Sequence, residues 1–472
     1  MTLNKNVLTR AVLTTVFILL VFIVDPLGIR NAAEKHYEDH ILRMWSPFYS
    51  QTVSKDITVV LLDDEFLQQI ETYPVNYATL SRLLKVISAH HPQSVFFDIL
   101  QHHEHSSRLN KWLKTLNSRS FPVFMASDTE YDTAAVLNDP DSLRHKISAV
   151  SQLTAVSWSG YQHYYPLSVD WQQQRMDTPA LALYKSWCRI TSQCSPAEQS
   201  QYLDPMIVQW SNKSALNQID YDNIKNCIPE HMSRFKQFIN ITFLSLTQGL
   251  RSDQELDKQL RERCPPFLTL SATRLFESGA VKSAPLNDAI KDRVIMIGYD
   301  LSGGVDIVRS PVHGTLPGVF YHAMALDNLM TLEDDYWRVP SATGFFKLSI
   351  ADMLEIVVQI STLFLVIWYR YTHLEQKQKL DTRKQIISGL MPAFIILFII
   401  LSSVLISQFI LKVGAPNWYG LILIIFFDLP IFLFYLFESM KNKCQKYLTI
   451  LNKFRKKFPQ ISIIKRKIKE HL

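Results

Sequence analysis

The sequence predicts an α/β protein with a mainly parallel sheet covered by helices, joined to four transmembrane helices. Between residues 27 and 348, continuous β-rich apolar runs alternate with segments of helical spacing. That alternation is typical of a sheet that is buried on both faces. Four other stretches are almost free of charge, as membrane-spanning helices require. With 472 residues, 47% of them hydrophobic, the chain is neither disordered nor fibrous.

The four apolar stretches define the predicted membrane segments. A transmembrane helix needs about 20 apolar residues, which the third and fourth stretches provide comfortably, whereas the first and second are short. No Ala-x-Ala cleavage site follows the first stretch, so we interpret it as an uncleaved anchor rather than a signal peptide. The predicted spans are residues 8–26, 349–370, 386–411 and 417–437.

Positive charge predicts the orientation of these spans. Loop 370–385 is rich in Lys and Arg, and the tail 439–472 carries eleven Lys or Arg between Lys441 and Lys469. The positive-inside rule places both segments in the cytoplasm. Both termini are then cytoplasmic, and residues 27–348 form a periplasmic domain of a multi-pass protein in the bacterial inner membrane. The excess of positive charge also favours contact of the tail with membrane lipid or with an acidic partner.

The cysteines agree with an oxidising location for the large domain. Cys188, Cys194, Cys227 and Cys264 lie within 27–348, and the fifth cysteine lies in the tail. Four cysteines allow three pairings, and proximity favours Cys188–Cys194 and Cys227–Cys264. The alternative is four buried free thiols, because spacing alone does not fix connectivity.

Each element of the large domain follows from local pattern. Residues 57–62, 94–100, 122–126 and 293–298 are predicted strands, because each is a continuous apolar run. Residues 77–89, 107–117 and 317–330 have the features of helices, the last beginning at Pro317. The region 130–285 is less regular, with helical patterns at 180–189 and 232–239. Together these patterns predict a large parallel α/β domain with insertions.

Short motifs in this domain resemble those of the second class of CHASE domain, the extracytoplasmic sensory module of bacterial cyclases and protein kinases. Their order, and the predicted arrangement of one membrane segment before the domain and three after it, are similar to that family. The matching motifs are Tyr37-Glu38-Asp39, Leu62-Asp63-Asp64-Glu65, Tyr73-Pro74, His91 to Ile99, Val294 to Gly298, Asp306, Ser310-Pro311, Pro317-Gly318-Val319, His322-Ala323 and Asp327-Asn328.

The resemblance implies a sensory or regulatory receptor subunit. Family members usually carry a signalling domain after the last span, whereas only a basic segment of about thirty residues follows here. We therefore expect a separate cytoplasmic effector protein as partner, and we also expect a homodimer. The alternative is a structural or assembly subunit of an envelope complex, with the periplasmic domain as a docking module.

Enzymatic activity, cofactors and nucleic-acid binding are not expected. Residues 298–304 lack the Gly-x-Gly-x-x-Gly spacing of dinucleotide-binding loops. No Gly-x-Ser-x-Gly nucleophile motif is present either. A periplasmic hydrolase is therefore only a remote third interpretation, and no nucleic-acid-binding motif occurs in the basic tail.

Acidic residues at the ends of predicted strands are the candidate ligand-binding residues. The carboxyl ends of parallel strands form the ligand crevice of such sheets, and the strands before Asp63 and Asp98 are expected to be neighbours. Carboxylates gathered there suit a cation, or a cationic or hydroxylated ligand. The alternative is that they cap helices or accept backbone N–H bonds. The candidates are Asp63, Asp64, Asp98, Asp300 and Asp306, together with His322 from the family-like motif.

Two further sites are candidates on their residue types alone. His102, His103 and His105 could ligate zinc or copper or titrate near neutral pH, whereas the alternative is a solvated loop. Asp428 lies in the middle of the fourth predicted span, two residues before Pro430. A carboxylate at that depth is either functional or a neutral group hydrogen-bonded between helices.

Overall fold

The computed structural model divides the chain into two units, and the α/β unit contains residues Glu34–Ala351 and Val404–Ala415. The second unit contains Met1–Ala33, Asp352–Ser403 and Pro416–Leu472. The structure describes residues 38–49, 54–161, 163–172, 174–191, 194, 204–212, 233–247, 265–303, 306–339, 350, 352–358, 360–362, 398–399, 402–403 and 405–413.

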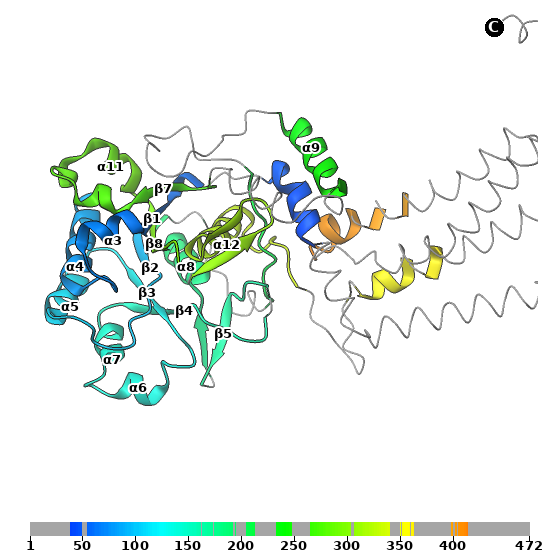
Figure 1. Ribbon diagram of the computed structural model, residues 1–472. Helices are drawn as coiled ribbons and strands as arrows, with labels where there is room; N and C mark the ends of the chain where they lie inside the picture. The colour runs from blue at the N-terminus through cyan, green and yellow to red at the C-terminus, as the bar shows by residue number, and fades with distance from the viewer. Residues whose placement is uncertain are drawn as a thin grey trace, which may run out of the picture. The chain divides into compact units, whose positions relative to one another are not determined.

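A six-stranded parallel sheet forms the centre of the α/β unit, with the strand order β4-β3-β2-β8-β1-β7 (Figure 1). All neighbours in this sheet pair in parallel, so the predicted mainly parallel sheet is confirmed. One expectation about its order was wrong: β1 and β2 are not neighbours, because β8 lies between them. The strands are β1 (Ile57–Asp63), β2 (Ser94–Phe97), β3 (Val123–Ser127), β4 (Gln152–Ala155), β7 (Leu268–Ser271) and β8 (Val294–Asp300).

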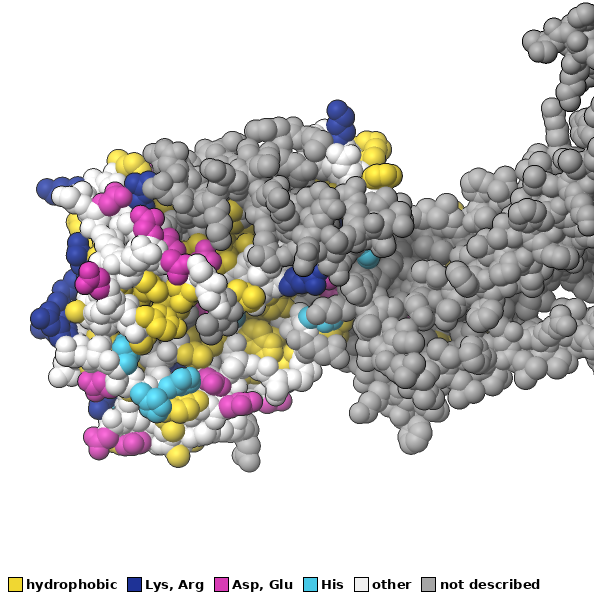
Figure 2. Space-filling model, in the orientation of Figure 1, with side chains coloured by type: hydrophobic (Ala, Val, Ile, Leu, Met, Phe, Trp, Pro, Cys, Tyr) yellow, Lys and Arg dark blue, Asp and Glu magenta, His cyan; other side chains and the backbone are white. Residues whose placement is uncertain are grey.

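Helices cover both faces of this sheet, and the alternation of side chains along β1 shows how. Val59 faces a core that contains residues of α8 (Pro179–Thr191) and α12 (Val319–Leu332). Val60 faces the opposite core with α4 (Tyr77–Ala89), α5 (Leu109–Asn117) and α11 (Ala284–Ile290). Successive strand residues point to opposite faces, so an uninterrupted apolar strand fills both cores. On the outside, basic and acidic side chains are mixed over α3 to α7 (Figure 2).

Polar caps fix where several helices begin. The Asn76 side chain accepts a hydrogen bond from Thr79 N at the start of α4, and Ser283 accepts one from Leu286 N at the start of α11. Such caps satisfy N–H groups that have no partner within the helix. The remaining elements are η2 (Ser46–Phe48), η3 (Ser54–Asp56), α3 (Asp64–Ile70), α6 (Ala134–Asn138), α7 (Leu143–Ser148), β5 (Ser168–Trp171), β6 (Gln174–Asp177), α9 (Arg234–Thr247), η6 (Ala272–Phe276), η7 (Ala280–Lys282), β9 (Ile307–Ser310) and β10 (Gly314–Pro317).

A buried ion pair joins the end of β3 to α7. Arg144 donates through Nε to Asp132 Oδ1 at 2.7 Å and through Nη2 to Asp132 Oδ2 at 2.6 Å. Both residues are fully buried. Ser127 donates to the same carboxylate, and Ala126 O accepts from Arg144 at 3.0 Å. Two charges that are buried away from water are stable only when they are extensively hydrogen-bonded. The hydrogen bonds of this pair connect the loop after β3 to α7.

The prediction of four transmembrane helices is wrong for the residues that the structure describes. None of the helices formed by them is long and apolar enough to cross a membrane. The end of the predicted span 386–411 belongs to the α/β unit, where Ile406–Ile410 forms a short π-helix. Apolar composition permits a span but does not dictate one continuous helix. The segments 8–26 and 417–437 lie outside the described residues.

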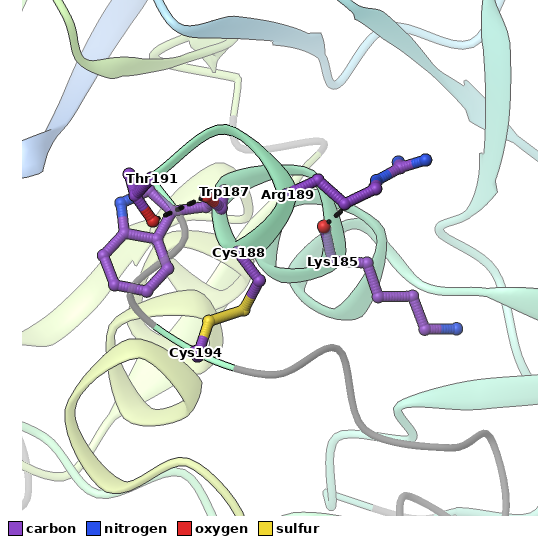
Figure 3. The surroundings of a disulfide bond; sticks show 6 residues. All are labelled: Lys185, Trp187, Cys188, Arg189, Thr191 and Cys194. Carbon is purple, nitrogen blue, oxygen red and sulfur yellow. Dashed lines mark hydrogen bonds between the residues drawn. A yellow bond between two sulfur atoms is a disulfide. The ribbon is translucent and has the colours of Figure 1, made fainter.

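The predicted disulfide between Cys188 and Cys194 is confirmed (Figure 3). Cys188 lies in α8 and is buried, and the two Cα atoms are 5.1 Å apart. The bond ties the segment after α8 back onto that helix, where Thr191 also donates to Trp187 O at 2.8 Å. The second predicted pair, Cys227–Cys264, lies outside the described residues.

Replacing both Cys188 and Cys194 by Ser is expected to lower the free energy of unfolding by about 2 kcal/mol. The bond closes a short loop, with a sequence separation of 6, so its removal frees only a small amount of unfolded-state entropy. Urea unfolding of the oxidised protein measures the loss, with Cys444→Ser as the control. Equal stability of the double variant and the wild type would contradict a stabilising disulfide.

Candidate functional site

The carboxyl edge of the sheet brings together the ends of β1, β8 and β2. Asp63 and Asp300 are register partners at the last position of β1 and β8. Asp98 follows β2, and its N–H donates to Ile297 O of β8 at 2.7 Å. The predicted gathering of these carboxylates at one edge is therefore observed, although β8 separates the two strands that were expected to be neighbours.

Asp63 and Asp64 serve the local structure at this edge. Asp63 Oδ1 accepts a hydrogen bond from Phe66 N at 2.9 Å and so caps α3, which is the alternative interpretation of this residue. Asp64 Oδ2 accepts from Ser302 N at 3.1 Å and from the Ser302 hydroxyl. These bonds hold the loop after β8 against α3. Both carboxylates therefore have protein partners.

Asp98 has a different environment. Its side chain is only 9% exposed, yet its carboxyl group accepts no hydrogen bond from the described residues. Burial, and then the charge of Asp306, raise the pKa of Asp98 well above its usual range. A buried carboxyl group without a donor is costly in its charged form. This group is therefore protonated over a wider pH range than an ordinary aspartate.

His322 belongs to the first turns of α12 and lies beside Asp98. Its Nε2 is 3.7 Å from Asp98 Oδ2, and its Nδ1 is 2.8 Å from the hydroxyl of Tyr165. That hydroxyl also accepts a hydrogen bond from Ala180 N at 3.2 Å. The Tyr165 hydroxyl and His322 Nδ1 are therefore hydrogen-bond partners within the core. Burial lowers the pKa of His322 to about 3, so the imidazole is neutral.

Asp306 and Gly318 complete the group at the start of α12. Gly318 N donates to Asp306 O at 3.1 Å. A Cβ atom added to Gly318 would overlap the Asp306 carboxyl group, which would then have to move aside. Partial burial raises the pKa of Asp306. Asp98, Asp306 and His322 therefore form one site, which we name the α12 site, with two carboxyl groups and a neutral imidazole.

The family model of the CHASE2 domain matches residues 14–366, about three quarters of the chain. This chain belongs to the CHASE2 family. CHASE2 domains are extracytoplasmic sensory domains, which agrees with a sensory role and with a periplasmic location of the matched segment. Neither the curated proteins nor the solved structures contain a match to this chain.

The ring nitrogens of the three candidate histidines of this CHASE2 domain lie near three different groups. His102 Nε2 is 4.0 Å from Asp128 Oδ2, and His103 Nδ1 is 3.2 Å from the Tyr131 hydroxyl. His105 Nε2 lies 3.0 Å from the carbonyl of a residue outside this loop, Val75. Within the described ranges, no three His, Cys, Asp or Glu side chains form a group that could hold a metal ion. The structure therefore gives the predicted metal site no converging ligands.

The remaining candidates from the sequence are Asp300, Asp428 and the basic tail. Asp300 is half-buried at the end of β8. Asp428 and the basic tail 439–472 lie outside the described residues, so the role of Asp428 and the lipid contact of the tail remain predictions from the sequence.

Tyr165 and Trp158 are the site residues that the sequence did not reveal. Tyr165 contacts His322 directly, and the Trp158 ring lies 6.0 Å from the imidazole centroid. Both belong to the irregular region 130–285, where no periodic pattern assigns a side chain to the core. The only signal available was their residue type, because a buried Tyr usually needs a hydrogen-bond partner.

Replacing Asp98 by Asn is expected to stabilise the CHASE2 domain more as the pH rises. Because the folded-state pKa of Asp98 is raised, its contribution to stability is complete below the ordinary pKa and is lost as the pH rises through the folded pKa. Asparagine cannot ionise, so the gap in unfolding free energy should widen by up to about 1.4 kcal/mol per pH unit. Urea unfolding between pH 4 and 8 measures it. A constant gap, as expected for the exposed Asp170→Asn control, would contradict the raised pKa.

Proposed function

We propose that this CHASE2 domain faces the periplasm and binds an extracytoplasmic signal at the α12 site. The observation that supports this proposal is Asp98, which is almost fully buried but accepts no hydrogen bond from the described residues. A carboxyl group in that state is stabilised when a ligand supplies the missing donor. The proposed role is binding and not catalysis, and the signal passes to an effector on another polypeptide.

The second half of α12 supports a route for the signal. Tyr49, which precedes β1, donates to Asp327 Oδ2 at 2.8 Å and accepts a hydrogen bond from Asn328 Nδ2 at 3.1 Å. Gln209 N donates to Asn328 Oδ1 at 2.9 Å. A shift of α12 caused by a ligand near His322 would therefore change its contacts with Tyr49 before β1 and with the segment that contains Gln209. Such a helix has the connections that a two-state relay needs.

Ligand binding is tested by thermal unfolding of the full chain with a panel of organic cations, amino acids and sugars. The proposal predicts that a stabilising compound loses its effect in Asp98→Asn. The matched control is Asp170→Asn, because the Asp170 side chain is 85% exposed. A compound that stabilises the wild type and Asp98→Asn equally would place binding elsewhere.

The effector is tested by purification of the full chain from its own cells in mild detergent, followed by mass spectrometry. A soluble kinase, cyclase or transcription regulator that is lost when residues 439–472 are deleted would agree with the receptor proposal. Stoichiometric envelope proteins that remain after the deletion would instead favour the docking-module alternative.

A further inference from the structure

Four aromatic side chains from three separate segments form a cluster on the α/β unit. Trp45 and Phe48 precede β1, Phe238 belongs to α9, and Phe409 follows residue 404. The Trp45 ring lies 5.6 Å from Phe48 and 5.5 Å from Phe409, and Phe48 lies 5.5 Å from Phe238. We name these four residues the aromatic cluster. Contacts between rings at these distances hold the three segments together.

The outer face of α9 extends this cluster with exposed apolar side chains. Phe235, Ile239 and Phe243 are 67%, 49% and 62% exposed, and their spacing of four residues places them on one side of the helix. The opposite side is buried through Gln237 and Ile241. Gln237 Oε1 also accepts from Asn212 Nδ2 at 2.8 Å. The helix is therefore packed on one side and presents large apolar groups on the other.

The segment that carries Phe409 enlarges the same apolar surface. Phe409 itself is 60% exposed although it contacts Trp45. Its apolar neighbours in the sequence are exposed as well, namely Leu405, Ile406, Ile410 and Leu411. Single exposed apolar residues are ordinary, but a gathered patch of this kind marks an interaction surface.

The charges on α9 indicate what this surface meets. Arg234 and Lys236 are exposed on either side of Phe235, and neither forms an ion pair or hydrogen bond with the described residues. The sequence of α9 contains no acidic residue. Basic and hydrophobic side chains lie next to each other at the position of α9 (Figure 2). Aromatic and aliphatic groups beside unpaired cations are typical of helices that lie on an anionic lipid surface.

A second copy of the chain fits this surface less well. In a two-fold symmetric contact the same patch meets itself, so the cations beside Phe235 would approach their own copies without an acidic residue on α9 to neutralise them. A bilayer offers phosphate groups to the cations and hydrocarbon to the rings at the same time. We propose that the outer face of α9 and the aromatic cluster together bind the surface of an anionic lipid bilayer. This inference does not depend on a ligand at the α12 site.

The test places a photoreactive benzoylphenylalanine at position 235 or 239 of the full chain in vesicles of phosphatidylethanolamine and phosphatidylglycerol. The expected product after illumination is a chain–lipid adduct identified by mass spectrometry. The matched control is position 281, because Val281 is also an exposed apolar residue, 53% exposed, and lies in η7 near α11. The control should form no lipid adduct.

A charge variant and two contrary outcomes complete the test. Arg234→Gln with Lys236→Gln should reduce the adduct at position 239 by roughly fivefold for each cation removed. An adduct of twice the chain mass at position 235 would overturn the proposal in favour of a second copy. Equal lipid labelling at positions 235 and 281 would also overturn it, because the lipid contact would then not be specific to α9.

Discussion

Replacing Arg144 by Met is expected to lower the free energy of unfolding by about 3–5 kcal/mol, the range for breaking a buried ion pair. The substitution leaves the carboxylate of Asp132 buried without its two guanidinium donors. Urea unfolding of the full chain measures the loss. The matched control is Arg175→Met, because the pair of Arg175 with Asp170 is exposed and should contribute less than about 1 kcal/mol.

The double variant Asp132→Leu with Arg144→Met distinguishes the cost of an unpaired buried carboxylate from the cost of lost packing. Since it removes both charges, it is expected to be more stable than Arg144→Met alone. If the single and double variants are equally unstable, the loss comes from packing and not from an unpaired carboxylate. If Arg144→Met and Arg175→Met lower the free energy of unfolding by the same amount, the burial of the Arg144–Asp132 pair has no energetic consequence.

Replacing Gly298 by Ala is expected to lower the free energy of unfolding by about 1–3 kcal/mol, the usual cost of overpacking a core. The added Cβ would lie 2.7 Å from Val319 Cβ and 2.9 Å from its Cγ1. Rotation of the valine side chain cannot move its Cβ, so the start of α12 must move away from β8. His322 lies three residues further along the same helix, and the α12 site should therefore be displaced as well.

Two variants check this explanation. Gly303→Ala is the control, because a Cβ there meets nothing within 4 Å. Val319→Ala removes the Cγ1 contact at 2.9 Å but keeps the Cβ contact at 2.7 Å, so combining it with Gly298→Ala should cost less stability than the sum of the two single losses. If the double variant loses as much unfolding free energy as the two single variants together, there is no steric contact between the two positions.

Local patterns in the sequence predicted the elements of the sheet well. The helix expected over 77–89 is observed with the same limits, and the strand expected over 57–62 extends by one residue. These segments have strong periodicity or continuous apolar runs, which reflect burial directly. In contrast, β4 and β7 of the central sheet and the hairpin of β5 and β6 were missed. These strands are only four residues long, and β4 and β6 contain exposed polar residues such as Gln152 and Gln174.

The sequence predicted where the candidate carboxylates lie, but not which partners each of them has. The carboxylates at the strand ends do lie at one edge, because parallel strands share the direction of their carboxyl ends. Asp98 lies beside His322 of α12, which is hydrogen-bonded to Tyr165, whereas Asp63 caps α3. Those differences arise from contacts between residues that are far apart in the sequence, which local pattern does not contain.

The position of β8 has a consequence for how the chain is made. β1 and β2 each pair with β8, yet residues 98–293 are synthesised between β2 and β8. At 5–20 residues per second, the ribosome needs roughly 10–40 s to supply the missing strand. During that interval β1 and β2 have open edges, which are prone to pair with other chains. Newly made chains should therefore depend on a chaperone that covers these edges until β8 arrives.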